Sequence, residues 1–100
     1  MSEGTENGSG IDAQRLEPNA DVIGQQLGDE VVLVHLKTNR IFELNRTGAR
    51  FWTLLQDESD RSRIEEQLQG EFDVSDQELA SEVDGLISQL AAEDLVRVSP

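Results

Sequence analysis

Residues 31–45, with the sequence VVLVHLKTNRIFELN, constrain the fold more than any other stretch of the chain. The first half is rich in β-branched and other apolar residues, as a strand is. A polar turn follows at Lys37–Arg40, where Asn39 can take a positive φ at low cost. Arg40–Leu44 then reads as a second strand, and Asn45 is a good helix N-cap because its side-chain oxygen can accept an amide hydrogen of the first turn. The stretch therefore predicts a β-hairpin that leads directly into a helix.

A third strand is expected before this hairpin. Val22–Leu27 is a weak strand candidate, and it ends at Gly28-Asp29, a two-residue turn signal. In the next predicted strand, Glu30–Leu36, both faces are largely apolar, which is typical of a strand covered on both sides or covered by a partner. These strands, joined by short turns, predict a three-stranded antiparallel sheet.

Three helices are expected after the sheet. Apolar residues at helical spacing predict the first over Arg46–Gln56. The second is expected to be capped by Ser59 or Asp60 and to end at Gly70 in the C′ position. The third begins with the capping box Ser75-Asp76-Gln77-Glu78, and its apolar stripe consists of Leu79, Val83, Leu86, Ile87 and Leu90. Leu95–Val98 is either a short closing strand or an extended tail.

The order β-β-β-α-α-α predicts an α+β fold of the winged-helix kind, with a three-stranded antiparallel sheet followed by three helices. Residues 1–20 contain three glycines and only scattered apolar residues, and such a segment cannot bury enough surface to offset the entropy of ordering it. We therefore expect a disordered tail over residues 1–20 and one domain over residues 21–100.

The charge of the chain restricts its partners. The formal net charge is −13, which argues against nucleic acid or an anionic membrane as a partner. The sequence has no cysteine, no apolar run long enough for a membrane span and no signal peptide, so a cytoplasmic protein is expected. Residues 37–56 stand apart with a net charge of +3, from Lys37, Arg40, Arg46 and Arg50 against Glu43. These basic residues either pair with acidic neighbours or receive an acidic side chain of a partner.

The sequence offers no convincing active site. His35 is the single histidine and lies within a predicted strand, without a second histidine or a cysteine to complete a metal site. There is no phosphate-binding loop, and no set of serine, histidine and acid has a defensible spacing. Binding is therefore favoured over catalysis. The edge strand Arg40–Leu44 has the character of a site for β-strand addition, although Phe42 and Leu44 are equally plausible as core residues.

Residues 37–52, KTNRIFELNRTGARFW, together with the run LISQL at 86–90 and Asp94-Leu95-Val96, resemble the PqqD-like proteins, the RiPP recognition elements. The resemblance covers about residues 22–98. It implies a domain that binds the leader segment of a ribosomally synthesised precursor peptide and presents it to a modifying enzyme or a leader peptidase, without a cofactor. In sequence, the motif is most similar to that of the leader-binding proteins of lasso-peptide pathways.

The resemblance also implies where the leader binds: as a strand antiparallel to the third strand, against the third helix. The docking edge would be Arg40, Ile41, Phe42, Glu43 and Leu44, and the opposite wall Val83, Leu86, Ile87 and Leu90. Lys37, Arg46 and Arg50 are further candidates for electrostatic contacts.

Two other functions compete with this one. A winged-helix DNA-binding regulator has the same element order, but Ser75–Asp94 carries no lysine or arginine. A homodimeric interaction protein would pair the free edge with itself, and we expect a monomer or a weak homodimer.

Overall fold

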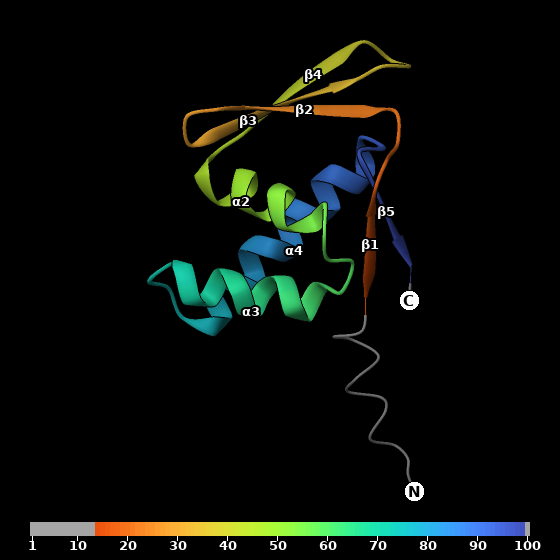
Figure 1. Cartoon of the computed structure of the whole chain (residues 1–100). Coiled ribbons are helices and arrows are strands. Elements are labelled where there is room, and N and C mark those ends of the chain that lie inside the picture. Colours follow the sequence, from red (N-terminus) through yellow and green to blue (C-terminus); the bar gives the residue numbers. More distant parts are fainter. Residues whose placement is uncertain (1–13, 100) are drawn as a thin grey trace, which may run out of the picture.

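The computed structural model of the protein describes residues 14–99. Strands β2 (Val22–Leu27), β3 (Glu30–His35) and β4 (Arg40–Leu44) form a three-stranded antiparallel sheet in the order β2-β3-β4. The sheet lies at one end of the molecule, above the helices (Figure 1). The predicted strands are confirmed to within one residue, and so is the α+β order of a sheet followed by three helices.

The turns of the sheet use the residues that the sequence indicates. Gly28 has a φ of 65° in the two-residue turn between β2 and β3, and Asn39 has a φ of 62° in the turn before β4. Glycine and asparagine take this left-handed conformation more easily than other residues do. The turns therefore fix the register of both hairpins.

The three helices are α2 (Arg46–Leu55), α3 (Arg61–Glu71) and α4 (Asp76–Ala92). The Asn45 side chain caps α2 by accepting the amide hydrogen of Gly48, with 3.0 Å between the two atoms. The capping box of Ser75 and Glu78 is present at the start of α4. Helix positions and caps thus follow from the local sequence.

The N-cap of α3 decides between two expected residues, and its C-terminal end differs from expectation. Its N-cap is Asp60, whose side chain accepts the amide hydrogen of Ser62 at 3.0 Å, and not Ser59. Gly70 was expected at C′ but lies inside the helix, which runs on to Glu71. The C-cap Phe72 has extended backbone, with a φ of −115°, so this helix end needs no glycine in the left-handed conformation.

A second sheet corrects the expected extent of the N-terminal tail. β1 (Arg15–Pro18) pairs antiparallel with β5 (Val96–Ser99), so part of residues 1–20 is ordered, and the C-terminal run is a strand (Figure 1). Leu16 is only 1% exposed, and its amide donates to the Ser59 carbonyl at 2.8 Å. The sequence gives no strand signal here, because Leu16 is a single apolar residue among polar neighbours. The strand that pairs with β1 lies at the far end of the sequence. Residues 1–13, the rest of the expected tail, lie outside the described residues.

One face of the sheet and the inner faces of the helices build the core. Val31, Leu33 and Leu44 point from the sheet into it, and Phe51, Trp52 and Leu55 meet them from α2. The opposite face of the sheet is open, with Ile23 and Ile41 exposed on either side of Val34. β3 is therefore buried on one face and only half covered on the other.

Two features are absent from residues 14–99. No helix in this part of the chain is long and apolar enough to cross a membrane. No group of three or more histidine, cysteine or acidic side chains lies together there in a way that could hold a metal ion.

Candidate functional site: the cleft between β4 and α4

β4 is an open edge of the sheet, because it pairs only with β3 among the described strands. The Leu36 amide donates to the Asp21 carbonyl at 2.8 Å. This bond identifies which residues of β3 turn their backbone N–H and C=O groups toward β2. Alternation along an antiparallel ladder then turns the backbone groups of His35 toward β4. By the same alternation, Ile41 and Glu43 present their N–H and C=O groups outward, where a further strand could pair with them.

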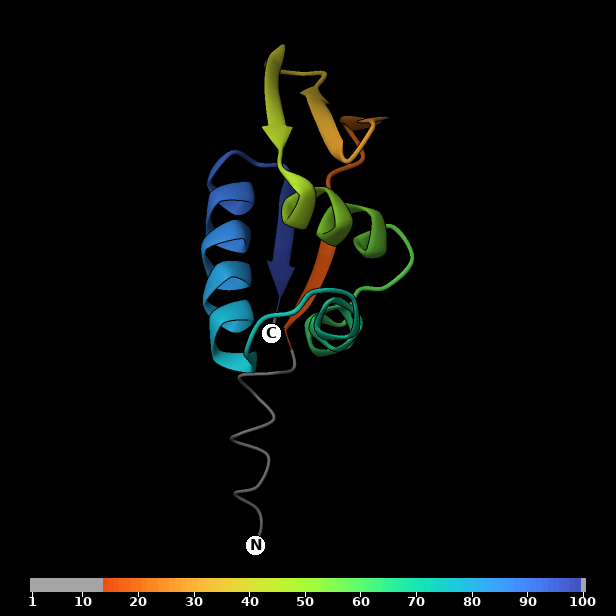
Figure 2. The same cartoon turned by 90° about the vertical axis from the view of Figure 1, so that its left-hand side faces the viewer.

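A cleft of about 160 Å³ lies beside this edge. β4 and the C-terminal end of α4 lie on the same side of the molecule (Figure 2). The cleft is lined from these elements by Phe42, Glu43, Leu44, Gln89, Leu90, Glu93 and Leu95. Most of this lining is apolar, from Phe42, Leu44, Leu90 and Leu95, and Gln89 and Glu93 add polar side chains from the α4 side, as in a pocket that receives one side of a peptide.

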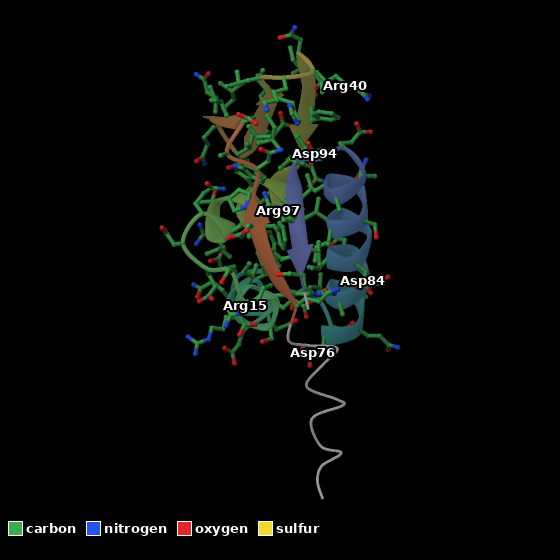
Figure 3. All side chains as sticks on the ribbon, turned by 90° about the vertical axis from the view of Figure 1, so that its right-hand side faces the viewer. Arg15, Arg40, Asp76, Asp84, Asp94 and Arg97 are labelled. Carbon is green, nitrogen blue, oxygen red and sulfur yellow. The ribbon has the colours of Figure 1, made fainter. Side chains whose placement is uncertain are left out.

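An ion pair bridges one end of the cleft. Arg40 Nη1 lies 2.9 Å from Glu93 Oε1, and the Arg40 guanidinium also lies 5.3 Å from the centre of the Phe42 ring. Figure 3 labels Arg40 near the end of α4. Both contacts keep the half-buried Phe42 ring between β4 and α4.

The single histidine joins the sheet to the end of α4. His35 is 1% exposed, and its Nδ1 accepts the Lys37 amide hydrogen at 3.2 Å. The other nitrogen, Nε2, therefore carries the proton and donates to Asp94 Oδ2 at 3.3 Å. Asn19 donates to the Asp94 carbonyl at 2.8 Å. These contacts give His35 a structural role, and they hold the loop after α4 against the sheet.

The structure brings together some of the site residues predicted from the sequence and separates others. Phe42, Glu43, Leu44 and Leu90 line one cleft, with Arg40 at its end. Ile41 is 67% exposed on the open face of the sheet. Val83 and Ile87 are buried in the core, and Leu86 is half-buried near Gly48 of α2.

Sequence reasoning missed Gln89, Glu93 and Leu95 as lining residues. Gln89 and Glu93 are spaced i, i+4, so they share one face of α4, beside Leu90. The helical period is the signal that could have identified these two polar residues, because they lie beside the apolar stripe of α4. Leu95 lies beyond the helix and gave no such signal.

The basic residues of 37–56 mostly pair with acidic neighbours. Lys37 Nζ lies 3.5 Å from Asp21 Oδ2, and Arg40 pairs with Glu93 as described. Arg50 donates two hydrogen bonds to Glu71, at 2.7 and 2.8 Å, which lower the pKa of Glu71 and raise that of Arg50. Arg46 alone among the four has no ion pair within residues 14–99, and its guanidinium lies 5.2 Å from the centre of the Phe72 ring.

The fold and the cleft define a small α+β domain with an open strand edge facing a helix. The chain belongs to the PqqD family, described as coenzyme PQQ synthesis protein D, which it matches over residues 30–96. This confirms the resemblance noted in the sequence. No curated protein is significantly similar to the chain in sequence.

Two solved structures share the fold. TbiB1, solved in complex with the TbiA(beta) leader peptide, is 27% identical with a TM-score of 0.77, over 81% of this chain and 94% of that one. A lasso peptide synthetase B1, complexed with the leader peptide, is 19% identical with a TM-score of 0.70, over 86% of this chain and 99% of that one. At 19% identity, the second likeness is one of fold.

Proposed function

We propose that this protein binds the leader segment of a ribosomally synthesised precursor peptide by β-strand addition to β4. It then presents the precursor to a maturation enzyme or a leader peptidase, in a pathway of the lasso-peptide type. The observation that carries this proposal is the open edge of β4 beside the cleft formed with α4. TbiB1, which shares the fold, was solved with a leader peptide, and this supports the same assignment.

The geometry divides affinity and specificity between two sets of groups. The outward backbone groups of Ile41 and Glu43 pair with the added strand, whatever its sequence. Alternate side chains of that strand point to the same face of the sheet as Phe42 and Leu44, and they enter the cleft against Leu90. Val83, Leu86 and Ile87 support this wall from the core side. Lys37 and Arg50 stabilise the domain through their ion pairs, so they contribute to leader binding only indirectly.

This role requires no chemistry from the chain. His35 is engaged in structural hydrogen bonds, which supports a binding function over catalysis. α4 carries no lysine or arginine with which to contact DNA phosphates, so the regulator alternative is not favoured. The absence of cysteine from the sequence fits a reducing cytoplasm as the place of action.

The test is a pair of proline substitutions, one on each edge of the sheet. Glu43→Pro removes an outward amide of β4 and leaves the ladder between β3 and β4 intact, and Gln26→Pro does the same on β2. A net hydrogen bond is worth about 1 kcal/mol, and the ring also blocks the approaching strand. Glu43→Pro should therefore weaken binding of the synthetic leader of the cognate precursor by about tenfold in isothermal titration calorimetry.

Gln26→Pro serves as the matched control and should leave the affinity for the leader unchanged. Circular dichroism must show that both variants are folded. Leader affinity that is unchanged in folded Glu43→Pro, or that falls equally in both variants, would refute binding at the β4 edge.

A further inference from the structure

The second edge of the sheet, β2, lacks the usual protection of an edge strand. Its sequence, VIGQQL, contains no charged residue and no proline, and its register with β3 is continuous without a bulge. Natural proteins generally protect exposed edges with charge, proline, bulges or covering segments. β4, by contrast, carries Arg40 and Glu43. An unprotected β2 is therefore a candidate for pairing with a further strand.

The backbone of β2 has free hydrogen-bonding groups on its outer side. The bond between Leu36 and Asp21 sets the alternation along the ladder, which turns the backbone groups of Val22, Gly24 and Gln26 outward. The Val22 amide is already used within the chain, because it donates to a carbonyl just before the strand. Among the described strands β2 pairs only with β3, so Gly24 and Gln26 remain available to a further strand.

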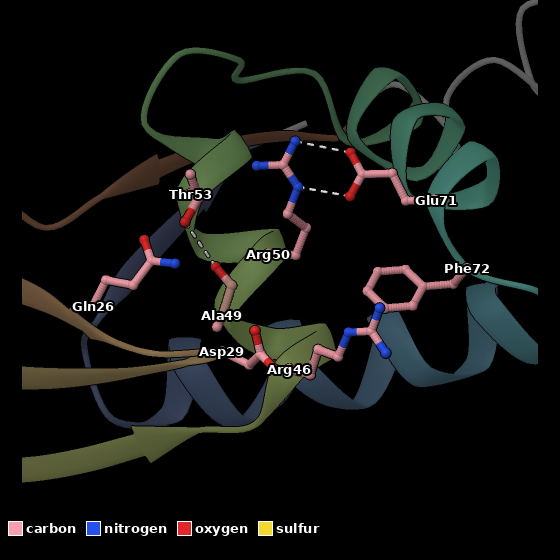
Figure 4. Close-up of a pocket in the computed structure, with 8 residues that line it drawn as sticks. All are labelled: Gln26, Asp29, Arg46, Ala49, Arg50, Thr53, Glu71 and Phe72. Atoms are coloured by element: carbon pink, nitrogen blue, oxygen red, sulfur yellow. Dashed lines mark hydrogen bonds and ion pairs between the residues drawn. The ribbon is translucent and has the colours of Figure 1, made fainter.

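Two adjoining pockets, of about 230 and 210 Å³, lie between β2 and α2. Both are lined by Gln26 and Thr53, so we treat them as one groove, the β2–α2 groove. Figure 4 shows its first part, where the Gln26 side chain lies across from Ala49 and Thr53 of α2. Gln26 Nε2 donates to the Gly28 carbonyl at 3.2 Å, whereas its Oε1 has no donor within residues 14–99. Gln26 therefore carries a free acceptor on the α2 side of the strand.

A buried donor in the same groove lacks an acceptor. Trp52 is 5% exposed and lines the second part of the groove. Its indole N–H has no hydrogen-bond acceptor in the described part of the chain, although its carbonyl accepts from Gln56. A Cβ built on Gly24 would lie 2.7 Å from Trp52 Nε1, so this nitrogen lies directly against β2. Buried donors are nearly always paired, and the missing acceptor has to reach the indole beside Gly24.

The β2 strand of a second copy can supply this acceptor. If two copies pair antiparallel about a two-fold axis at Gln25, Gly24 lies opposite Gln26 of the partner subunit, and Gln26 lies opposite the partner's Gly24. These residues turn their backbone groups outward, so each pair exchanges two hydrogen bonds. Residues directly opposite each other share a face of the sheet. Gln26 of the partner subunit therefore lies on the α2 side beside Gly24, within reach of the Trp52 indole.

The same register matches the exposed apolar residues of β2. Ile23 is 53% exposed and Leu27 is 55% exposed, both on the face of the sheet away from the helices. With the axis at Gln25, Ile23 lies opposite Leu27 of the partner subunit, and each covers the other. An axis one residue to either side would instead place both apolar residues opposite polar or charged ones. The side chains therefore favour the register in which Trp52 gains its acceptor.

The net charge of −13 does not fall on this part of the molecule. Residues 21–56, which form the sheet and α2, carry four acidic and four basic side chains: Asp21, Asp29, Glu30 and Glu43 against Lys37, Arg40, Arg46 and Arg50. Asp21, which would lie opposite Asp29 of the partner subunit just beyond the paired residues, is offset by Lys37 at 3.5 Å. The acidic excess lies outside this segment, and salt screens it beyond about 8 Å under physiological conditions.

We propose that two copies of this chain associate through β2, about a two-fold axis at Gln25, into one six-stranded antiparallel sheet in which Gln26 of the partner subunit accepts the hydrogen of the Trp52 indole. The dimer is weak, because one strand pair buries less surface than the roughly 1,200–2,000 Å² of stable interfaces. Both outer edges of the joined sheet are then β4, whose charged residues oppose further pairing, so association stops at two copies. The inference does not depend on leader binding, because it concerns the other edge.

The test follows self-association of the full chain by sedimentation velocity, over a concentration series at physiological salt. Gln26→Pro removes an outward amide of β2 and should abolish the dimer. Gln26→Leu keeps this amide but removes the side-chain acceptor, so it should weaken the dimer by about tenfold. Dilution of the parent protein should shift the emission of Trp52, the single tryptophan of the chain, because the indole loses its acceptor.

A pair of charge variants tests the position of the axis. Gln25 is exposed, and in the dimer it faces Gln25 of the partner subunit. Gln25→Glu and Gln25→Lys should each weaken self-association severalfold, because like charges then lie directly opposite each other. An equimolar mixture of the two variants should restore association as a heterodimer. This rescue requires the two side chains to lie opposite each other, and a merely structural role of Gln25 would not produce it.

Three results would overturn the proposal. The first is a parent protein that is monomeric throughout the concentration series. The second is a mixture of the Gln25 variants that associates no more strongly than either variant alone, a comparison that holds even if Gln26→Pro does not fold. The third is self-association that persists in folded Gln26→Pro and is lost in folded Glu43→Pro, which would assign the contact to β4. Circular dichroism establishes the folding of each variant.

Discussion

Replacing Gly24 with alanine tests the packing between β2 and α2 directly. The added Cβ would lie 2.7 Å from Trp52 Nε1 and 3.2 Å from Leu33 Cδ2. Leu33 is fully buried and Trp52 nearly so, which means that neither side chain can swing into solvent. Overpacking of this kind costs about 1–3 kcal/mol of the free energy of unfolding.

This cost should be visible in thermal unfolding. For a domain of this size, each kcal/mol lowers the midpoint by about 4–8 °C. Gly24→Ala should therefore unfold at a lower temperature, as followed by circular dichroism and by the emission of Trp52. Gly85→Ala is the matched control, because Gly85 lies within α4 and a Cβ there meets nothing within 4 Å. It should raise stability by about 0.5–1 kcal/mol through helix propensity.

A double-mutant cycle isolates the contact. In a Trp52→Phe background the indole nitrogen is gone, so Gly24→Ala should cost less there than in the parent protein. Equal costs in the two backgrounds, or a Gly24→Ala variant as stable as the parent, would refute the reasoning.

Two further predictions concern stability. The hydrogen bonds from Arg50 lower the pKa of Glu71, so this pair stabilises the fold above the ordinary glutamate pKa, near 4.5, and the stabilisation is lost as the pH falls through the lowered value. In urea unfolding at neutral pH, the free energy of unfolding of the parent should exceed that of Glu71→Gln by up to about 1 kcal/mol. This difference should decrease as the pH falls through the lowered pKa of Glu71. A difference that does not change with pH would contradict the reasoning. Leu16→Ala should cost about 2–5 kcal/mol in the same assay, because Leu16 is buried in the core, and a loss below about 0.5 kcal/mol would show that β1 contributes little.

Local sequence signals predict much of this fold. The alternation in residues 31–44, the turn at Asn39 and the caps Asn45 and Ser75 each act within a few residues, and each is found as expected. β1 escaped prediction because its stability comes from pairing with β5 and from the burial of Leu16, both of which depend on residues distant in sequence. The prediction from Gly70 was wrong for the opposite reason. Glycine is a strong local signal for a helix end, but α3 continues to Glu71, and its C-cap has extended backbone.

The sequence predicts the β4 side of the candidate site better than the α4 side. An open β4 edge follows from the strand order, and the family resemblance indicates its use. The helical period places Val83, Ile87 and Leu90 on one stripe, but it does not show that Val83 and Ile87 face the core while Leu90 also reaches the cleft. That distinction depends on the angle between α4 and the sheet, which is set by tertiary packing. The groove under β2 gave no sequence signal, because it depends on how Gly24 and Trp52 meet.

The pairing of β1 with β5 also determines how the protein can be attached to other molecules. Arg15 lies opposite Ser99, so both ends of the described chain leave the domain at the same place, at the far end from the three-stranded sheet (Figure 1). A surface tether, a dye or a fused protein joined after Ser99 would thus leave both β2 and β4 unobstructed. One immobilised preparation can therefore report on ligands of the two edges, separately or together.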